Sequence, residues 1–338
     1  MSGTPPIDVR PMEDDDVDAV VDLLGRALGP GPGGADRREL FVWKHLRNPF
    51  GRSIALVAED EGRLVGVRAF MRWRFGTADG AEVEAVRAVD TATAPEVQRR
   101  GVFSSLTRAG LERCAAEGIP LVFNTPNSKS LPGYLKLGWR EVAQWPMWLR
   151  VRRPVKMAGA AVRRDLSSGG PVAPGSDRLR TADELLGRAN LEPVSASPTA
   201  AGLSTRRSGA YLRWRYAEGP LPYHGLFADD PPALVLARIR SRGSLTEAVV
   251  CEALGDSGAL SGLLREVPRA AKADHAVAHF GRGSAAHEAL RGAGYRRLPK
   301  AGMTFVVRPV EGVSPPPGSP DPLAASSWSL SLGDLELF

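Results

Sequence analysis

A short basic loop carries the clearest chemical signal in this chain: Gln98-Arg99-Arg100-Gly101-Val102-Phe103. An apolar run at residues 85–89 precedes the loop and predicts a strand, and the apolar spacing after it predicts a helix. The first amides of a helix lack intrahelical partners and carry about half a positive charge, so they attract anions. Arg99 and Arg100 add full charges with a geometry that suits phosphate, and Gly101 allows close backbone approach. The stretch therefore predicts an anion site.

A second group of polar residues follows the next predicted strand. Residues 121–125 indicate a buried strand that ends in a turn at Pro126 and Asn127. A helical segment with Ser130 and Tyr134 comes next. A phenol can protonate a leaving group, whereas Asn127 either holds an extended ligand or caps the helix. We interpret the two stretches as two halves of one site.

Together the two stretches resemble the GNAT superfamily of acyltransferases, which bind acyl-coenzyme A (acyl-CoA). Residues 95–102 are similar to its pyrophosphate loop, Gln/Arg-x-x-Gly-x-Gly/Ala, with matches at Gln98 and Gly101 and a departure at Phe103. Residues 127–139 resemble the motif in which Asn, a small residue and Tyr precede Lys-x-Gly-aromatic. The resemblance implies acetyl-CoA, or another acyl-CoA, as co-substrate, and no metal. It implies these cofactor-binding residues: Thr91, Ala92, Thr93, Gln98, Arg99, Arg100, Gly101, Val102, Phe103, Asn127 and Ser130.

The candidate catalytic residues follow from what attack on a thioester requires. The amine must be neutral, and protonation helps the thiolate to leave. By the resemblance, Tyr134 is the general acid; the alternative is an aromatic ring packed under the loop. Glu84 and Asp90, with Glu82 beside them, are the candidate bases on the preceding strand, although strand carboxylates are often solvated edge residues. Some two-domain members use a C-terminal carboxylate, which here belongs to Phe338; a docking strand is the other interpretation.

The elements around these motifs predict an α/β (α+β) fold with a mixed, mostly antiparallel central sheet flanked by helices. The predicted elements, in order, are strand 7–10, helices 17–28 and 38–46, strands 54–59 and 64–75, a strand to residue 93, a helix from 102, a strand to 125, the Tyr134 helix and a last strand at 142–151. This is the element order of one GNAT domain.

The chain is predicted to hold two such domains. The expected boundaries are a catalytic GNAT domain at 1–151, a basic Gly/Pro/Ser linker at 152–180, a degenerate GNAT-like domain at 181–310, and a Pro-rich connector with a C-terminal docking strand at 311–338. A weak recurrence supports a duplication, because Trp214 echoes Trp43 and Gly294 echoes Gly138 in similar surroundings. Chance similarity between two α/β patterns is the alternative.

The second copy lacks the reactive residues of the first. Residues 255–258 stand where the anion loop belongs, and Asp256 or Ser257 would cap the next helix and repel phosphate. Leu290 takes the place of Tyr134. We therefore expect the second domain to bind no cofactor and to serve as a substrate wall and packing partner.

Composition narrows the class of protein further. The chain has 338 residues, of which 43% are hydrophobic and 24% charged, as in ordinary globular proteins. No apolar run is long enough to span a bilayer and no signal pattern opens the sequence, so a cytoplasmic location without membrane attachment is expected. Cys114, Cys251 and the scattered histidines show no metal-ligand spacing. The basic residues lack interleaved aromatics, so nucleic-acid binding is not predicted, and the cluster at 152–164 indicates a solvated linker.

The predicted function is transfer of an acetyl group from acetyl-CoA to a primary amine of a small molecule: an amino sugar, an amino acid or a natural-product intermediate. The alternative enzyme is a Fem-type aminoacyl-tRNA transferase, which also pairs two GNAT-like domains. An intact pyrophosphate loop favours acyl-CoA, because tRNA-using relatives do not need it. The non-enzyme alternative is a degenerate acyl-CoA-binding or scaffold protein, against which Tyr134 and Asn127 argue.

Overall fold

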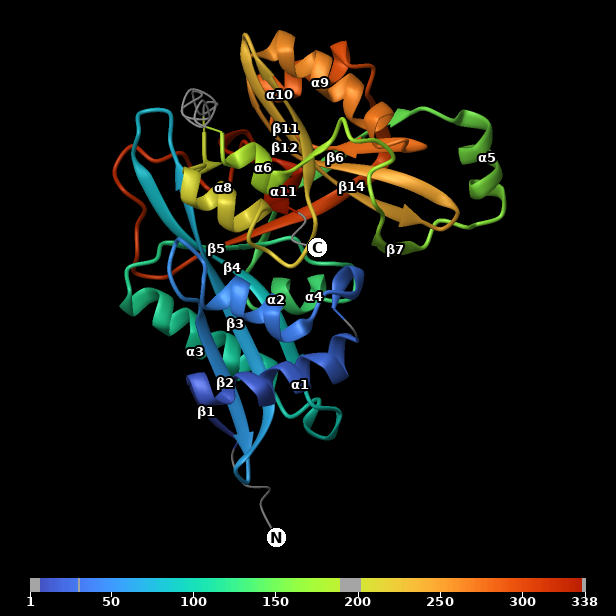
Figure 1. Cartoon of the computed structure of the whole chain (residues 1–338). Coiled ribbons are helices and arrows are strands. Elements are labelled where there is room, and N and C mark those ends of the chain that lie inside the picture. The colour runs from blue at the N-terminus through green and yellow to red at the C-terminus, as the bar shows by residue number, and fades with distance from the viewer. Residues whose placement is uncertain (1–6, 30, 189–201, 336–338) are drawn as a thin grey trace. The chain divides into compact units, whose positions relative to one another are not determined.

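The computed structural model describes residues 7–29, 31–188 and 202–335. These residues form two compact units (Figure 1). The first unit takes its residues from 1–75, 82–141 and 306–319, and the second from 76–81, 142–305 and 320–338. The first unit thus combines three separate stretches of the chain, whereas the expected catalytic domain was the continuous stretch 1–151.

The first unit has a mixed sheet in the order β1-β2-β3-β4-β5-β14, in which β14 contributes its end, Val306 to Pro309. Its strands are β1 (Asp8–Pro11), β2 (Ile54–Asp60), β3 (Arg63–Gly76), β4 (Glu82–Thr93), β5 (Leu121–Asn124) and β14 (Arg296–Pro309). The β1/β2, β2/β3 and β5/β14 pairs are antiparallel, and the β4/β5 pair is parallel. This confirms the predicted mixed, mostly antiparallel fold.

Four helices accompany this sheet: α1 (Val17–Leu28), α2 (Arg37–His45), α3 (Val102–Ala116) and α4 (Leu131–Lys136). The apolar face of α1 packs into the core, and α2 begins where the Asp36 carboxylate accepts a hydrogen bond from the Glu39 amide at 2.7 Å. The elements of the first unit up to α4 thus follow the predicted order.

Two glycines bring α3 close to β3. A Cβ on Gly66 would lie 2.6 Å from Val102 Cγ1, and one on Gly110 would lie 2.1 Å from the Phe70 ring. Real Cβ atoms do not approach other atoms so closely, so only glycine allows this contact. The helix that follows the basic loop is therefore held against the sheet at both ends of its first three turns.

The second unit has a sheet in the order β14-β6-β13-β12-β11-β10-β8, with β7 beside β11. Its further strands are β6 (Arg140–Val151), β7 (Ser168–Pro171), β8 (Arg180–Thr181), β9 (Ser204–Thr205), β10 (His224–Asp229), β11 (Pro232–Arg242), β12 (Leu245–Gly255) and β13 (His275–Ala278). Its helices include α5 (Pro154–Val162), α6 (Ala182–Leu186), α8 (Gly209–Tyr216), α9 (Ser257–Ala270), α10 (Ala285–Gly292) and α11 (Leu332–Leu335) (Figure 1). Its core lies between the sheet and the α9 and α10 helices.

The predicted strand at 142–151 is present as β6. β6 pairs antiparallel with β13, from His275↔Val151 to Ala278↔Trp148. The place beside β5 is taken by Val306 to Pro309 of β14. An apolar strand pattern predicts a strand but not its partner, because any strand with matching alternation can pair there.

Two further segments differ from expectation. The expected linker contains α5 and β7, and Lys156 of α5 donates to Asp274 Oδ2 at 2.6 Å, so part of the basic cluster is paired rather than only solvated. Pro154 starts α5 because proline suits the first helical turn. Of the docking strand expected within 311–338, the described residues form isolated bridges at Trp328 and Ser331 before α11 begins.

Candidate active site

The basic loop leads into a helix whose first amides are open. Arg99 and Gly101 both adopt left-handed backbone conformations, with φ of 67° and 83°. Alternation of right- and left-handed residues turns successive amides toward one concave side, which suits an anion. Gly101 is the N-cap of α3 and has no side chain to accept from the helix amides. Among the described residues, the amides of Gln98 and Arg100 donate to the carbonyls of Pro95 and Val97, and the open donors of the kind predicted are those at the start of α3.

A cavity of about 540 Å³ opens at this loop within the first unit. It is lined by Ala27, Leu28, Thr91, Ala92, Thr93, Val97, Gln98, Arg99, Gly101, Val102, Phe103 and Ser104. The proposed cofactor-binding residues thus meet there, except for Arg100, Asn127 and Ser130. Ala27 and Leu28, at the end of α1, were missed; the exposed apolar Leu28 (53%) next to a Gly-rich break was the available signal.

The residues that do not line the cavity have partners of their own. Arg100 Nη1 donates at 2.7 Å to Oδ2 of Asp60, the last residue of β2. Asn127 Oδ1 accepts from the amides of Lys129 and Ser130, both at 3.0 Å. Asn127 therefore shapes the turn into α4, which is the capping alternative of the sequence analysis.

The pairing between β4 and β5 ends where the cavity begins. β4 pairs with β5 only from Ala85↔Leu121 to Arg87↔Phe123, although β4 continues to Thr93. Among the described residues, β5 offers no partner for the last part of β4. An extended ligand can add to such an edge as a further strand.

Tyr134 lies directly behind the cavity wall. It is 5% exposed, and its ring packs edge-on against Phe103 and Trp139, with ring centroids 6.1 and 5.2 Å apart. Arg68 Nη1 donates to Tyr134 Oη at 3.0 Å and to Thr91 Oγ1 at 2.6 Å. Sequence reasoning missed Arg68, although an arginine within the apolar run of β3 was a visible signal.

The structure separates Glu84 from this group. Glu84 pairs with Arg74, with Oε1 2.7 Å from Nη2, and its side chain is 41% exposed. It lies seven residues before Thr91 along β4, a distance of about 23 Å at the usual rise of a strand. Its neighbour Glu82 pairs with the same arginine at 3.3 Å. Both are therefore solvated strand carboxylates, and the proposed base role of Glu84 loses its geometric support.

Asp90 lies next to Thr91 but is enclosed by two basic side chains. Lys44 and His45 of α2 both contact its Oδ2, His45 through Nε2 at 2.7 Å. The other ring nitrogen of His45 contacts Ser53 Oγ at 2.8 Å. Asp90 has a φ of 39°, a strained value for a residue with a side chain, so the network holds a kink in β4.

This network makes Asp90 a poor base. Burial raises the pKa of the Asp90 carboxyl, but the Lys44 charge and the hydrogen bond with His45 outweigh burial and lower that pKa below its usual 3.8. Burial lowers the pKa of His45 and of Lys44 against the attraction of Asp90. A carboxylate whose charged form is this strongly favoured accepts a proton reluctantly. The geometry gives Asp90 a structural role, in which its network holds the conformation of β4.

The equivalent helix of the second unit begins differently. The Asp256 carboxylate accepts hydrogen bonds from the amides of Gly258 and Ala259 at 2.8 and 3.0 Å, at the start of α9. This confirms the predicted cap. The donors that α3 leaves open are satisfied in α9, and the carboxylate would repel phosphate.

The strand gap of the second unit is also filled. β12 and β13 are parallel and pair from Glu247↔His275 to Val250↔Ala278, as β4 and β5 do before they part. Beyond this point Ser331 forms a bridge with Phe280, and the Leu332 amide donates to the His279 carbonyl at 2.8 Å. The segment Ser331 to Leu335 therefore continues the pairing past the end of β13, whereas the described residues beside β5 offer no such segment.

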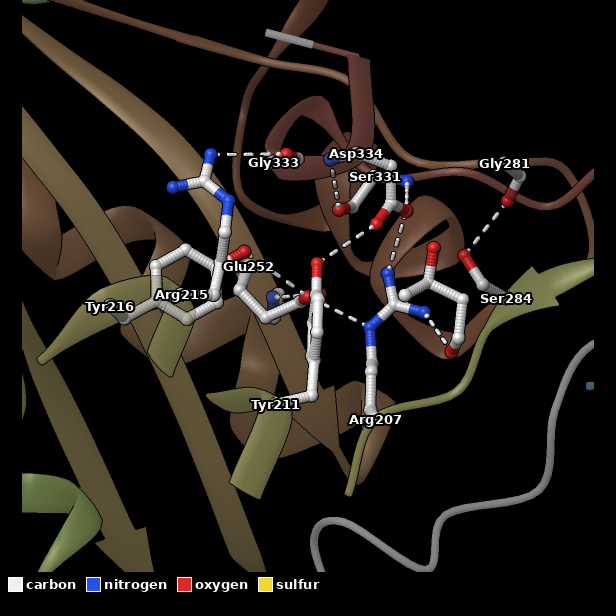
Figure 2. Close-up of polar contacts among 12 residues, drawn as sticks. Arg207, Tyr211, Arg215, Tyr216, Glu252, Gly281, Ser284, Ser331, Gly333 and Asp334 are labelled. Carbon is white, nitrogen blue, oxygen red and sulfur yellow. Dashed lines mark hydrogen bonds and ion pairs between the residues drawn. The ribbon is translucent and has the colours of Figure 1, made fainter. Parts of the chain in front are cut away.

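A buried ionic cluster holds this segment (Figure 2). Arg207 contacts Glu252 at 2.8 Å and Asp334 at 2.9 Å, and both carboxylates are almost fully buried. Tyr216 Oη lies 3.3 Å from Glu252, and Arg215 Nη2 donates to the Gly333 carbonyl at 3.1 Å. Breaking such a pair on one side leaves a buried charge uncompensated, so the cluster fixes the segment in place.

The helices that carry Tyr134 and Leu290 end in the same way. The amide of Trp139 donates to the Tyr134 carbonyl at 3.2 Å, and that of Tyr295 to the Leu290 carbonyl at 3.0 Å. Both turns contain a left-handed glycine. Leu290, which is fully buried, therefore occupies the position of Tyr134.

An open anion loop, two parting parallel strands and a tyrosine behind them, on a mixed sheet, are features of a GNAT-type acyltransferase domain. Residues 8–142 match the family described as "Acetyltransferase (GNAT) domain". This match assigns residues 8–142 to the GNAT acetyltransferase family, whose enzymes transfer acyl groups.

Solved structures agree on the fold. A probable N-acyltransferase of Enterococcus faecalis V583 is 14% identical, with a TM-score of 0.57 over 91% of this chain and 73% of that one. A GCN5-related N-acetyltransferase of Kribbella flavida is 17% identical, with a TM-score of 0.59 over 90% and 71%. Eis1 of Mycobacterium abscessus is 16% identical, with a TM-score of 0.55 over 90% and 74%. No curated protein matches this chain in sequence.

Proposed function

We propose that the first unit transfers an acetyl group from acetyl-CoA to a primary amine of a small molecule. The observation that carries this proposal is the cavity of about 540 Å³ at the uncapped start of α3. Its lining supplies open amides and the Arg99 charge at one side and the unpaired end of β4 at the other. We further propose that the two units are tandem GNAT-like domains and that only the first is catalytic.

The lining fits the parts of acyl-CoA. The amides of Val102 and Phe103, with Arg99, would hold the pyrophosphate. The backbone of Thr91 to Thr93 would hold the pantetheine arm as an added strand. Acetyl-CoA would supply an activated thioester carbonyl, and the residues of the cavity would position that carbonyl.

The reaction needs one proton donor near the sulfur. The amine nitrogen forms a bond to the carbonyl carbon, the carbon–sulfur bond breaks, and its electron pair goes to sulfur. Tyr134 gives its phenolic proton to that sulfur. The amine nitrogen loses one proton in turn; because Asp90 is enclosed and Glu84 is distant, we propose that solvent accepts it. Phe338, the other candidate base, lies outside the described residues.

The open loop favours acyl-CoA over aminoacyl-tRNA, because a tRNA substrate does not need a pyrophosphate site. The retained Tyr134, with a hydrogen-bonded hydroxyl behind the cavity wall, favours an enzyme over a scaffold. A cytoplasmic location stays a prediction from the sequence. None of the described helices is long and apolar enough to cross a bilayer.

Calorimetry with acetyl-CoA, free CoA and tRNA tests the donor. We expect both CoA species to bind and tRNA not to bind. A panel of amino sugars, amino acids and other primary amines in a thiol-release assay then identifies the acceptor class. Binding of tRNA without binding of CoA would contradict the proposal in favour of the Fem-type alternative, and CoA binding without thiol release on any amine would favour the scaffold.

A further inference from the structure

In the part of the chain that the structure describes, Arg68 is a buried cation without a carboxylate partner. It shares a strand face with Gly66 and Phe70, the residues on which α3 packs. The side chain is fully buried, and within the described chain its hydrogen bonds go only to Thr91 and Tyr134. Its Nε and Nη2 atoms have no partner and do not reach solvent. A buried charge of this kind is costly, so its environment must compensate for it.

Three aromatic rings provide part of that compensation. The guanidinium carbon lies 4.9 Å from the ring centre of Phe70, 5.2 Å from that of Phe103 and 5.1 Å from that of Tyr134. Cations are attracted to ring faces at such distances. Because Nε and Nη2 are closed off from solvent, Arg68 cannot touch a ligand in the cavity. Any effect of Arg68 on the reaction must therefore act through the residues that Arg68 contacts.

The hydrogen-bond pattern shows which neighbour receives that effect. One Nη1 atom carries two hydrogens, and Arg68 directs them to Thr91 Oγ1 and Tyr134 Oη. A guanidinium has no acceptor, so Tyr134 cannot return its own hydrogen to Arg68. Thr91 Oγ1 has the Val89 carbonyl within 3.5 Å as an acceptor, whereas no described residue accepts from Tyr134 Oη. Tyr134 therefore keeps a free O–H.

We propose that Arg68 is a positioning residue for proton transfer, which orients the free O–H of Tyr134 and stabilises the negative charge left on Oη. The proposal rests on the proposed acyl transfer, in which Tyr134 gives its proton to the sulfur as the carbon–sulfur bond breaks. The phenolate formed beside the guanidinium is then reprotonated by solvent, which has taken the proton lost by the amine. A fixed positive charge beside a developing negative one lowers the barrier without reorganisation.

A double-mutant cycle tests this role through turnover. Arg68→Met removes the charge and both hydrogen bonds, and we expect kcat to fall about 10- to 100-fold, the value of one charge-assisted hydrogen bond. The Kd and KM for acetyl-CoA should stay within about twofold, since Arg68 touches no ligand. In a Tyr134→Phe background the same change should cost less than about threefold. Arg68→Lys, which keeps the charge, should restore kcat to within about tenfold of wild type.

The outcomes separate the two proposals. If Tyr134→Phe itself keeps normal turnover, the acid assignment fails and the role of Arg68 falls with it. If Tyr134→Phe is slow but Arg68→Met turns over normally, or is equally damaging in both backgrounds, only the role of Arg68 is overturned. Should Arg68→Met not fold, Arg68→Gln, a neutral donor, is compared with Arg68→Lys; equal kcat values for the two would overturn the charge argument.

Discussion

The two units carry the same strand–loop–helix step and differ in what occupies it. In the first unit Gly101 leaves the start of α3 open, and β4 runs past β5 beside a cavity. In the second unit Asp256 caps α9, and the segment from Ser331 fills the space beside β12. On the proposed tandem arrangement, a GNAT-like fold therefore does not by itself make a cofactor site.

The polar clusters of the two units show the same contrast. In the first unit Asp90 pairs with Lys44 and His45 and keeps β4 kinked beside the cavity. In the second unit Glu252 belongs to a larger cluster that is completed by Arg207 and Asp334 (Figure 2). The Asp90 cluster supports the strand beside the cavity, whereas the Glu252 cluster holds the segment from Ser331 beside β12.

The largest effect is expected at Tyr134, where the second unit has Leu290. Tyr134→Phe should lower kcat by roughly 10²–10⁴, the usual contribution of a general acid, with an unchanged KM for acetyl-CoA. Stability should also fall by about 1–3 kcal/mol, because Arg68 loses a buried partner. The control is Tyr295→Phe in the second unit, which removes the hydrogen bond to the Leu264 carbonyl. Tyr295→Phe should leave turnover intact. Equal turnover in both variants would contradict the assignment of Tyr134 as the general acid.

The next effect concerns Asp90. Asp90→Asn leaves the buried Lys44 without its counter-charge and replaces the carboxylate that pairs with His45, and we expect the free energy of unfolding to fall by about 3–5 kcal/mol. The pKa of Asp90 is lowered in the fold, so its stabilisation is complete above its ordinary pKa of 3.8 and is lost as pH falls further. The difference between wild type and variant should thus be constant near neutral pH and shrink below about pH 4.

Urea unfolding at several pH values measures this difference. Asp18→Asn is the matched control, because Asp18 forms an exposed pair with Arg38 and should contribute about 0–1 kcal/mol. If Asp90→Asn lowered the free energy of unfolding no more than Asp18→Asn does, the buried network would not have the structural role assigned to it.

The loop arginines are expected to differ from one another. Arg99 lines the cavity, whereas Arg100 is paired with Asp60. Arg99→Glu should weaken acetyl-CoA binding at least tenfold, since a charge-assisted contact is worth about 1.5–3 kcal/mol. Arg100→Glu should weaken it by less than about threefold. Titration calorimetry of both folded variants decides; equal losses would mean that Arg100 leaves Asp60 to bind the cofactor.

The smallest effect is expected at the cap of the second unit. Asp256→Ala should lower stability by about 0.5–2 kcal/mol, the usual value of an N-cap. It should create no second cofactor site, because the segment from Ser331 still fills the strand gap. A second binding event in this variant would show that the cap alone had closed the site.

Local signals were predictable from the sequence, and contacts between distant residues were not. The Gln98–Phe103 loop and the Asp256 cap depend on neighbours within a few residues, so their residue types suffice. Arg68 lies 66 residues before Tyr134, and His45 lies 45 residues before Asp90, so no spacing rule connects them. The partner of β6 was missed for the same reason, because alternation does not specify which strand is adjacent.

The number of acetyl-CoA molecules bound per chain tests the central claim most directly. In this account the open start of α3 in the first unit is the cofactor site, and the corresponding start of α9 in the second unit is closed. Titration calorimetry of the wild-type chain should then saturate at one acetyl-CoA per chain, and Arg99→Glu should weaken that single binding event. Saturation at two, or one event that Arg99→Glu leaves unchanged, would contradict the account.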